Sequence, residues 1–358
     1  MKKGTVLFII IFCSVHFAFG QLTAPKYSNE FLNIGVGSRA LGMFNVQAAT
    51  VGDVTAGYWN PAGLLKIQSK YELAGMHAEY FAGMAKYDYL GAAVRLDSNS
   101  VLAINAIRFG TDEIPNTLNL YDNQGNNTPN YNNISYFSSA DYAFLVSFAR
   151  TNNLLPGLNL GATLKVIHRT VGPFGNAWGF GLDAGAQYVR KNWQFGLMAR
   201  DVTGTYNAWS FNTALFEKTF AQTGNEIPQN SIEVTLPRLI FGVGRSKRFK
   251  QDKFGLLAGV DFDFTFDRKR NVLVKSNFAS IDPHVGLELD YKKIVFLRAG
   301  AGNTQQIKDF DGKSKTDVQA NFGVGIKINR VSIDYALTGV GANANLYSNI
   351  FSLKLALK

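Results

Sequence analysis

From about residue 69 onward, the chain alternates between apolar and polar side chains with a period of two. In one such stretch, Trp178, Phe180 and Leu182 fall on one face, while glycines and polar residues fall on the other. This period is typical of a β-strand that has one apolar face. The sequence therefore predicts an all-β protein with fourteen such segments, at 69–81, 84–97, 99–110, 138–150, 157–169, 177–189, 192–203, 232–246, 252–265, 279–291, 293–302, 315–328, 330–340 and 346–357.

The connections between these segments alternate in length. Long polar connections at 111–137, 204–231, 266–278 and 303–314 fall between short ones at 98, 151–156, 190–191, 247–251, 292 and 329. Outer-membrane barrels have long outer loops and short periplasmic turns, and about ten tilted residues cross the apolar layer. The sequence therefore predicts a 14-stranded antiparallel transmembrane β-barrel spanning residues 69–358.

Residues 21–68 do not follow the strand pattern. They contain a helix-like stretch from Arg39 to Ala49, an acidic break at Asp53, and a turn at Asn60 and Pro61. Pro61 has no N–H and disfavours a helical Asn60, whose side chain can close the turn on its own backbone. One interpretation is an N-terminal hatch or plug held inside the barrel. The alternative is a helix and loop packed outside a soluble β domain.

Residues 1–20 are predicted to be a secretory signal peptide. Lys2 and Lys3 precede an apolar run at 6–12, and small residues precede cleavage between Gly20 and Gln21. A lipoprotein signal with Cys13 as the lipidated residue is the alternative, but Phe12 is a poor neighbour for it. An exported chain without an apolar helix of 18 residues can still cross a membrane as a β-barrel. We therefore predict the outer membrane of a Gram-negative bacterium.

The charge of the chain is basic, with a formal net charge of +10. Because an exported protein seldom meets nucleic acid, the positive net charge indicates a membrane surface or a protein as the partner. The basic residues of the short turns can meet anionic lipid headgroups or an acidic partner, or can simply be solvated. They are Arg150, Arg190, Lys191, Lys247, Arg248, Lys250, Lys292, Lys293 and Arg330.

No catalytic, metal or cofactor site is predicted. After signal cleavage the chain has no cysteine, and His77, His168 and His284 lack the spacing of metal ligands. We therefore expect no enzyme activity and no cofactor. The charged residues on inward-facing positions have mixed sign, which favours a salt-bridged interior over an ion pore. They are Lys165, Arg169, Asp183, Arg200, Asp261, Asp263, Glu288, Arg298, Lys327 and Asp334.

The N-terminal third resembles a known family. Phe31 to Met43 (FLNIGVGSRALGM), Asp53 to Leu64 (DVTAGYWNPAGL) and Lys86 to Val94 (KYDYLGAAV) resemble the signature of the PorV/PorQ family, most closely a PorV-like paralogue. That family resembles FadL-type channels, with fourteen strands and a hatch that carries an Asn-Pro-Ala motif. The resemblance places this hatch motif at Asn60, Pro61 and Ala62.

The resemblance implies a non-enzymatic role in type IX protein secretion. Partners would be the cargo C-terminal signal domains and other secretion proteins, such as the translocon barrel or the attachment complex. They would bind outer-loop residues such as Tyr121, Tyr131, Tyr136, Tyr206 and Trp209, because aromatic anchors are common hot spots. The alternative is a FadL-like transporter of small hydrophobic molecules gated by the hatch. A soluble periplasmic β protein is the third hypothesis.

Overall fold

The computed structural model describes residues 29–121, 128–152, 155–217, 220, 224–308, 311–339 and 347–358. The predicted signal peptide and its cleavage site lie outside these residues. The strands are β1 (Tyr71–Tyr80), β2 (Ala85–Arg95), β3 (Ser100–Asn116), β4 (Ser135–Thr151), β5 (Leu158–Val171), β6 (Gly175–Arg190), β7 (Trp193–Arg200), β8 (Thr205–Phe211), β9 (Ser231–Thr235), β10 (Arg238–Phe249), β11 (Phe254–Thr265), β12 (Ser280–Tyr291), β13 (Val295–Lys308), β14 (Ser314–Ile328), β15 (Val331–Gly339) and β16 (Tyr347–Leu357).

The strands form a closed antiparallel barrel. Each strand pairs with its neighbour along the chain, except that β7 does not pair with β8 or β9 with β10; β7 pairs with β10 instead, and β1 pairs with β16, beginning at Tyr71 opposite Leu357. The ring is closed by β1 to β7 and β10 to β16, which makes fourteen crossings. Closure satisfies the backbone groups that an open sheet edge would expose to lipid. The predicted fold and all fourteen predicted crossings are confirmed.

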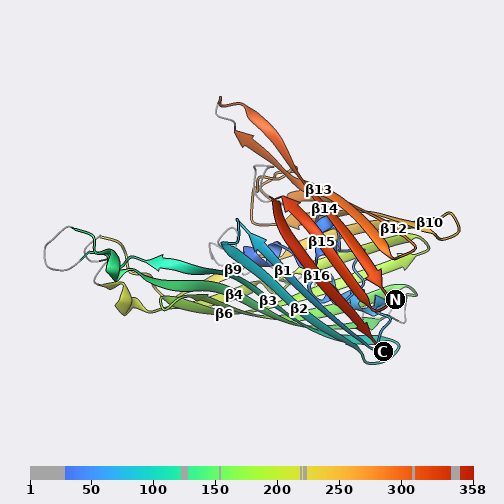
Figure 1. Cartoon of the computed structure of the whole chain (residues 1–358), viewed down its shortest axis with the longest axis horizontal. Coiled ribbons are helices and arrows are strands. Elements are labelled where there is room, and N and C mark those ends of the chain that lie inside the picture. The colour runs from blue at the N-terminus through green and yellow to red at the C-terminus, as the bar shows by residue number, and fades with distance from the viewer. Residues whose placement is uncertain are drawn as a thin grey trace, which may run out of the picture.

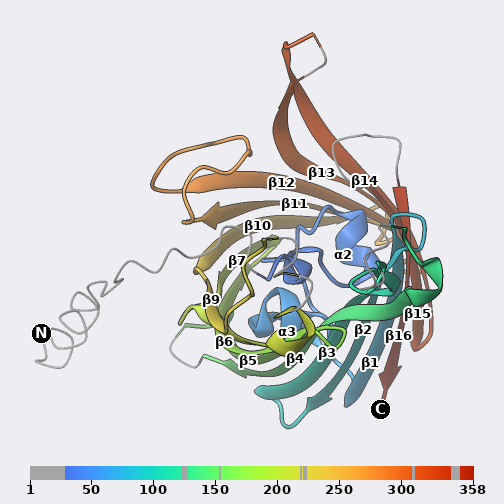
Figure 2. The same cartoon turned by 90° about the vertical axis from the view of Figure 1, so that its left-hand side faces the viewer.

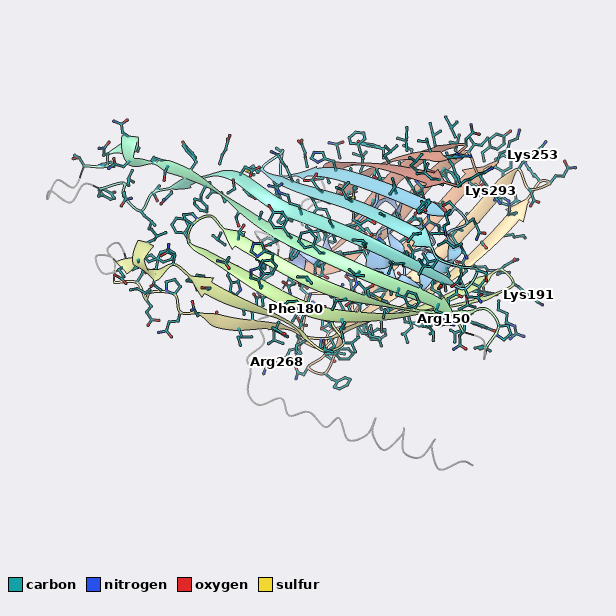
Figure 3. The ribbon with its side chains drawn as sticks, turned by 90° about the horizontal axis from the view of Figure 1, so that it is seen from below. Arg150, Phe180, Lys191, Lys253, Arg268 and Lys293 are labelled. Atoms are coloured by element: carbon teal, nitrogen blue, oxygen red, sulfur yellow. The ribbon has the colours of Figure 1, made fainter. Side chains whose placement is uncertain are left out.

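The apolar faces point away from the barrel, as the alternation predicted. On β6, Trp178, Phe180 and Leu182 are exposed on the outer surface, while Gly181 and Asp183 are buried on the inner side. Figure 3 shows Phe180 on the strand wall between the two ends of the molecule. None of the helices in the described ranges is long and apolar enough to cross a membrane.

Two crossings are interrupted, which the sequence pattern did not reveal. The C-terminal part of β6, residues 184–190, pairs with β7, whereas its N-terminal part, residues 175–180, pairs with β8. Residues 201–204 form the turn between β7 and β8, where Asp201 and Gly204 have positive φ angles of 54° and 70°. The next crossing is interrupted between β9 and β10, at Leu236 and Pro237, and Pro237 cannot donate a ladder hydrogen bond.

Two hairpins extend beyond the barrel as arms (Figure 1). The first consists of β3 and β4 and carries the 3-10 helix η3 (Tyr131–Asn133); the second consists of β13 and β14. Both contain a register shift, between Thr111 and Ile114 in the first and between Gly302 and Gln305 in the second. Bulges bend and twist a strand pair, and they hide the period of two. The predicted loops 111–137 and 303–314 are therefore partly strand, which corrects the prediction.

Residues 29–68 lie within the ring of strands, where α2 and α3 are seen in the end view of Figure 2. This inner segment contains η1 (Glu30–Asn33), α2 (Ser38–Gly42), α3 (Ala56–Trp59) and η2 (Pro61–Lys66). The helix predicted over 39–49 is wrong in extent, because α2 ends at Gly42. Phe44 and Asn45 have positive φ angles of 52° and 64°, which no helix continues through. The interpretation that placed this segment outside the β domain is contradicted.

Candidate functional site

The inner segment is joined to the barrel wall through Asn60. Asn60 is fully buried, and its Oδ1 accepts a hydrogen bond from the N–H of Ala62 at 3.2 Å. Its Nδ2 donates to the carbonyl of Ala48 at 2.8 Å and to the carbonyl of Ala186 on β6 at 3.1 Å. The side chain thus closes the predicted turn before Pro61 and ties that turn to the wall. Local sequence predicted the turn, but not the bond to β6.

Replacing Asn60 with alanine is expected to destabilise the folded barrel by about 2 kcal/mol, because three buried backbone groups lose this partner. The expected result is a lower temperature for the shift in gel migration that accompanies barrel unfolding. Asn132→Ala is the matched control, since Asn132 is exposed on the first arm. Equal shift temperatures for the two variants would show that the bonds of Asn60 carry no net stability.

Glycines on the inner face of the wall allow the inner segment to approach the wall backbone. A Cβ added at Gly161 would lie 2.6 Å from the nitrogen of Ala62, and one at Gly185 would lie 2.1 Å from Oδ1 of Asn60. A Cβ at Gly196 would lie 2.0 Å from the carbonyl oxygen of Ala48. The interior is therefore crowded at these three glycines, because the inner segment contacts the wall there.

A chain of buried charges links the inner segment to β12, β13 and β15. Nε of Arg39 lies 2.9 Å from Glu288, whose carboxylate also accepts from Nε of Arg298 at 2.6 Å. Arg298 reaches Asp334 through Nη1, again at 2.6 Å. Alternating signs compensate the charges in this buried region. The sequence predicted Glu288, Arg298 and Asp334 as inward-facing, but not the role of Arg39.

A second ion pair joins the inner segment to the last strand. Asp53 lies 2.7 Å from Nζ of Lys354 on β16. Burial opposes ionisation of Asp53, but the Lys354 ammonium and the hydroxyl of Thr55 outweigh it and hold the pKa of Asp53 well below its usual range. Lys354 was not among the charges predicted to face inward, although its place on the same face as Ile350 and Ser352 marks it as inward-facing.

A small polar cavity lies beside the interruption between β7 and β8. Its lining includes Lys165, whose Nζ lies 2.7 Å from Asp183 and 2.5 Å from Asp201. Arg200 also lines it, stacked 4.4 Å from the ring centroid of Tyr58. The free volume is about 50 Å³, and a second cavity beside Arg39 and Asp53 has about 30 Å³. A cavity needs roughly 10–15 Å³ to hold one water molecule, so each has room for a few.

The other charges predicted to face inward are compensated in different ways. Asp261 accepts hydrogen bonds from the backbone N–H groups of Gln47 and Ala48 at 2.8 and 2.9 Å. Arg238 pairs with Asp263, and Arg169 pairs with Asp141 at 2.8 Å. Lys327 follows Gly323 and Gly325 on the inward-facing side of β14, as predicted, but it is exposed to solvent at the end of the strand.

The predicted metal-free character of the histidines remains a prediction. His77 lies 2.7 Å from Asp88, His284 lies 3.1 Å from Asp282, and His168 stacks on Trp178 with ring centroids 4.1 Å apart. Within the described part of the chain, no cluster of three or more His, Cys, Asp or Glu side chains is arranged to hold a metal ion.

The structure separates the five aromatic residues predicted for partner binding. Tyr121, Tyr131 and Tyr136 lie on the first arm and are 60%, 71% and 68% exposed, although Tyr136 belongs to β4 and not to a loop. Tyr206 and Trp209 belong to β8, so their predicted position in the loop 204–231 is wrong. Tyr206 packs on the outer wall 6.3 Å from Phe180, and Trp209 donates its Nε1–H to Glu233 at 3.0 Å.

Comparison with known proteins gives a fold and no family assignment. No family model matches the sequence, and no curated protein matches it either. Solved structures that are similar include the CymD monoaromatic hydrocarbon channel, with 14% identity, a TM-score of 0.56, and coverage of 90% of this chain and 98% of CymD. The toluene transporter TbuX of Ralstonia pickettii has 12% identity, a TM-score of 0.52, and coverage of 90% and 99%.

A FadL homologue of Pseudomonas aeruginosa is also similar, with 12% identity, a TM-score of 0.52, and coverage of 90% of this chain and 98% of the homologue. The chain therefore has the fold of FadL-like outer-membrane barrels, whose outer surface contacts membrane lipid. The predicted PorV/PorQ membership is not confirmed by these comparisons.

Proposed function

We propose that this outer-membrane barrel binds protein partners through its outer arms and serves, without catalysis, as a component of protein secretion. The observation that carries this proposal is the filled interior. The inner segment occupies the barrel, and the cavities beside it are small and lined with charges. By comparison, an apolar cavity of about 150 Å³ in a soluble protein binds benzene. In this proposal the inner segment acts as a plug, and Asn60, Pro61 and Ala62 form the hatch motif that the sequence resemblance implies.

The arms supply the binding surface in this proposal. Tyr121, Tyr131 and Tyr136 are exposed on the first arm, which is formed by one of the long connections and the strands beside it. Partner sites of this kind are enriched in tyrosine. The assignment to type IX secretion, with cargo C-terminal domains as partners, rests on the sequence resemblance. None of the comparisons points to a secretion system.

Transport of a small hydrophobic molecule is the second candidate, and the structural neighbours favour it over secretion. CymD is a monoaromatic hydrocarbon channel and TbuX is a toluene transporter. For this chain to transport such a molecule, the inner segment would have to move, because its bonds to β6 and β16 close the centre of the barrel. The similar solved structures favour a transport function, whereas the charged lining of the interior favours a protein that binds partners on its outside.

Purification of a tagged copy from cell envelope distinguishes the two candidates. Co-purification of exported proteins that share a C-terminal domain supports docking. A hydrophobic small molecule bound in a preparation free of such proteins supports transport and would overturn the docking proposal.

The arm residues give a sharper test. The double variant Tyr131→Ser and Tyr136→Ser is expected to weaken partner recovery about tenfold or more, as loss of hot-spot aromatics does. Tyr71→Ser is the control, because Tyr71 is 46% exposed but lies at the opposite end of the barrel, where β1 begins. If the double variant recovers as much partner protein as the wild type, the first arm is not part of the binding surface.

A further inference from the structure

An apolar groove runs across the outer surface of β10 to β14. One row of paired residues forms its floor: Val243 pairs with Val260, Val260 with Val285, Val285 with Ala301, and Ala301 with Ala320. The groove has a free volume of about 680 Å³, more than ten times that of the cavity beside Lys165. It faces the lipid, because these side chains point away from the inner segment.

The groove is two rows of side chains wide. Beyond the floor row on one side, Phe241 pairs with Phe262. On the other side lies a second row that also lines the groove, and beyond it Leu256 pairs with Leu289. The second row consists of Arg245, Ala258, Leu287, Ala299 and Phe322. Because neighbouring strands lie about 4.8 Å apart, the floor row across five strands is about 20 Å long.

A positive charge lines one end of the groove. Arg245 is exposed there, and its guanidinium lies 4.9 Å from the ring centroid of Trp193 on β7. Lys247 lies two residues further along the same outer face of β10. Among the described residues, no carboxylate forms an ion pair with either side chain. Both groups are therefore free to meet an anion outside the barrel.

The same end of the barrel is basic over a wider area. Arg150, Lys191, Lys253 and Lys293 lie together at the end with the short turns (Figure 3). In outer-membrane barrels this end faces the periplasm. Basic groups beside an apolar belt attract the phosphates of membrane lipids. The positive charge and the apolar groove together therefore fit one molecule that has an anionic head and an apolar tail.

We propose that this groove binds a phospholipid of the periplasmic leaflet, with one acyl chain along the Val243 to Ala320 row and the phosphate at Arg245 and Lys247. A flexible chain of methylene groups can follow the valine and alanine side chains of this row, and the positive charge of Arg245 and Lys247 favours a lipid with an anionic head. The site is independent of whether the barrel docks proteins or transports a molecule, so failure of either function leaves it intact.

Lipid retention tests the proposal. The purified barrel is incubated with phosphatidylglycerol in mild detergent, excess lipid is removed, and bound lipid is counted by native mass spectrometry. We expect about one retained phosphatidylglycerol on the wild-type barrel. Ala299→Phe, which fills the groove, is expected to reduce retention at least fivefold. Ala92→Phe is the matched control, because Ala92 is exposed on the outer face of β2, away from the groove.

The headgroup is tested separately. The double variant Arg245→Gln and Lys247→Gln is expected to reduce retention of phosphatidylglycerol at least fivefold and to leave the weaker retention of diacylglycerol unchanged. Each variant is first shown to fold by its heat-dependent migration on gels. Equal retention by wild type and Ala299→Phe would overturn the proposal. If the wild type forms a dimer and Ala299→Phe is monomeric without loss of lipid, the occupant of the groove is instead a second copy of this chain.

Discussion

Replacing Arg298 with methionine is expected to lower the free energy of unfolding of the barrel by about 3–5 kcal/mol. The Arg298 side chain is only 3% exposed and lies between Glu288 and Asp334. Without it, Asp334 stays buried with its charge uncompensated, whereas Glu288 keeps Arg39 as a partner at 2.9 Å. The measurement is the denaturant concentration at which the folded band on an unheated gel is lost.

Two companion variants make this result specific to the buried charge. Adding Asp334→Asn to Arg298→Met removes the uncompensated carboxylate and is expected to restore part of the lost stability. Lys86→Met breaks an exposed pair, in which Lys86 lies 3.4 Å from Asp112, and should cost less than about 1 kcal/mol. If Arg298→Met were no more harmful than Lys86→Met, the charge chain would not stabilise the interior.

Replacing Gly196 with alanine is expected to push the inner segment away from the wall. The added Cβ would lie 2.0 Å from the oxygen of Ala48 and 2.5 Å from the nitrogen of Ala49, so backbone must move. The same Ala48 oxygen accepts hydrogen bonds from Asn60 and Gln187, at 2.8 and 3.1 Å, and both bonds would be lost. The expected cost is about 3 kcal/mol, at the upper end of overpacking effects.

Limited trypsin digestion measures this displacement directly. In the wild type, Arg39 is bound to Glu288 and Lys66 donates to the carbonyl of Ala49 at 3.0 Å, so both sites should resist cleavage. Gly196→Ala should speed cleavage at them. Gly75→Ala is the control, because a Cβ at Gly75 meets its nearest neighbour at an ordinary 3.5 Å. Equal digestion of both variants would mean that the inner segment does not depend on close contact with β7.

Much of the barrel can be predicted from sequence because its pattern is local. The period of two on β6 follows from lipid on one side of the strand and a polar interior on the other, so each residue reports its own surroundings. The prediction weakened wherever a strand departs from regular pairing. The bulges at 111–114 and 302–305 made long strands read as loops, and the turn at Asp201 and Gly204 divided one crossing into β7 and β8.

The contacts of the candidate site could be predicted less well from the sequence. The turn at Asn60 and Pro61 is a property of adjacent residues, and the sequence predicted it. The partners of the inner segment are distant in the chain: Arg39 meets Glu288, and Asp53 meets Lys354. A charged residue at an inward-facing position must be compensated, but which opposite charge compensates it depends on barrel closure and register.

The sequence alone determined the strand periodicity, the number of crossings and the local turn before Pro61, because each depends on neighbouring residues and on the solvent that each face meets. Only the tertiary structure decided that the N-terminal segment lies inside the ring, which buried charges pair, and that small residues on five strands line up as an outer groove. These features depend on the register between strands, which sets which residues become neighbours when the sheet closes.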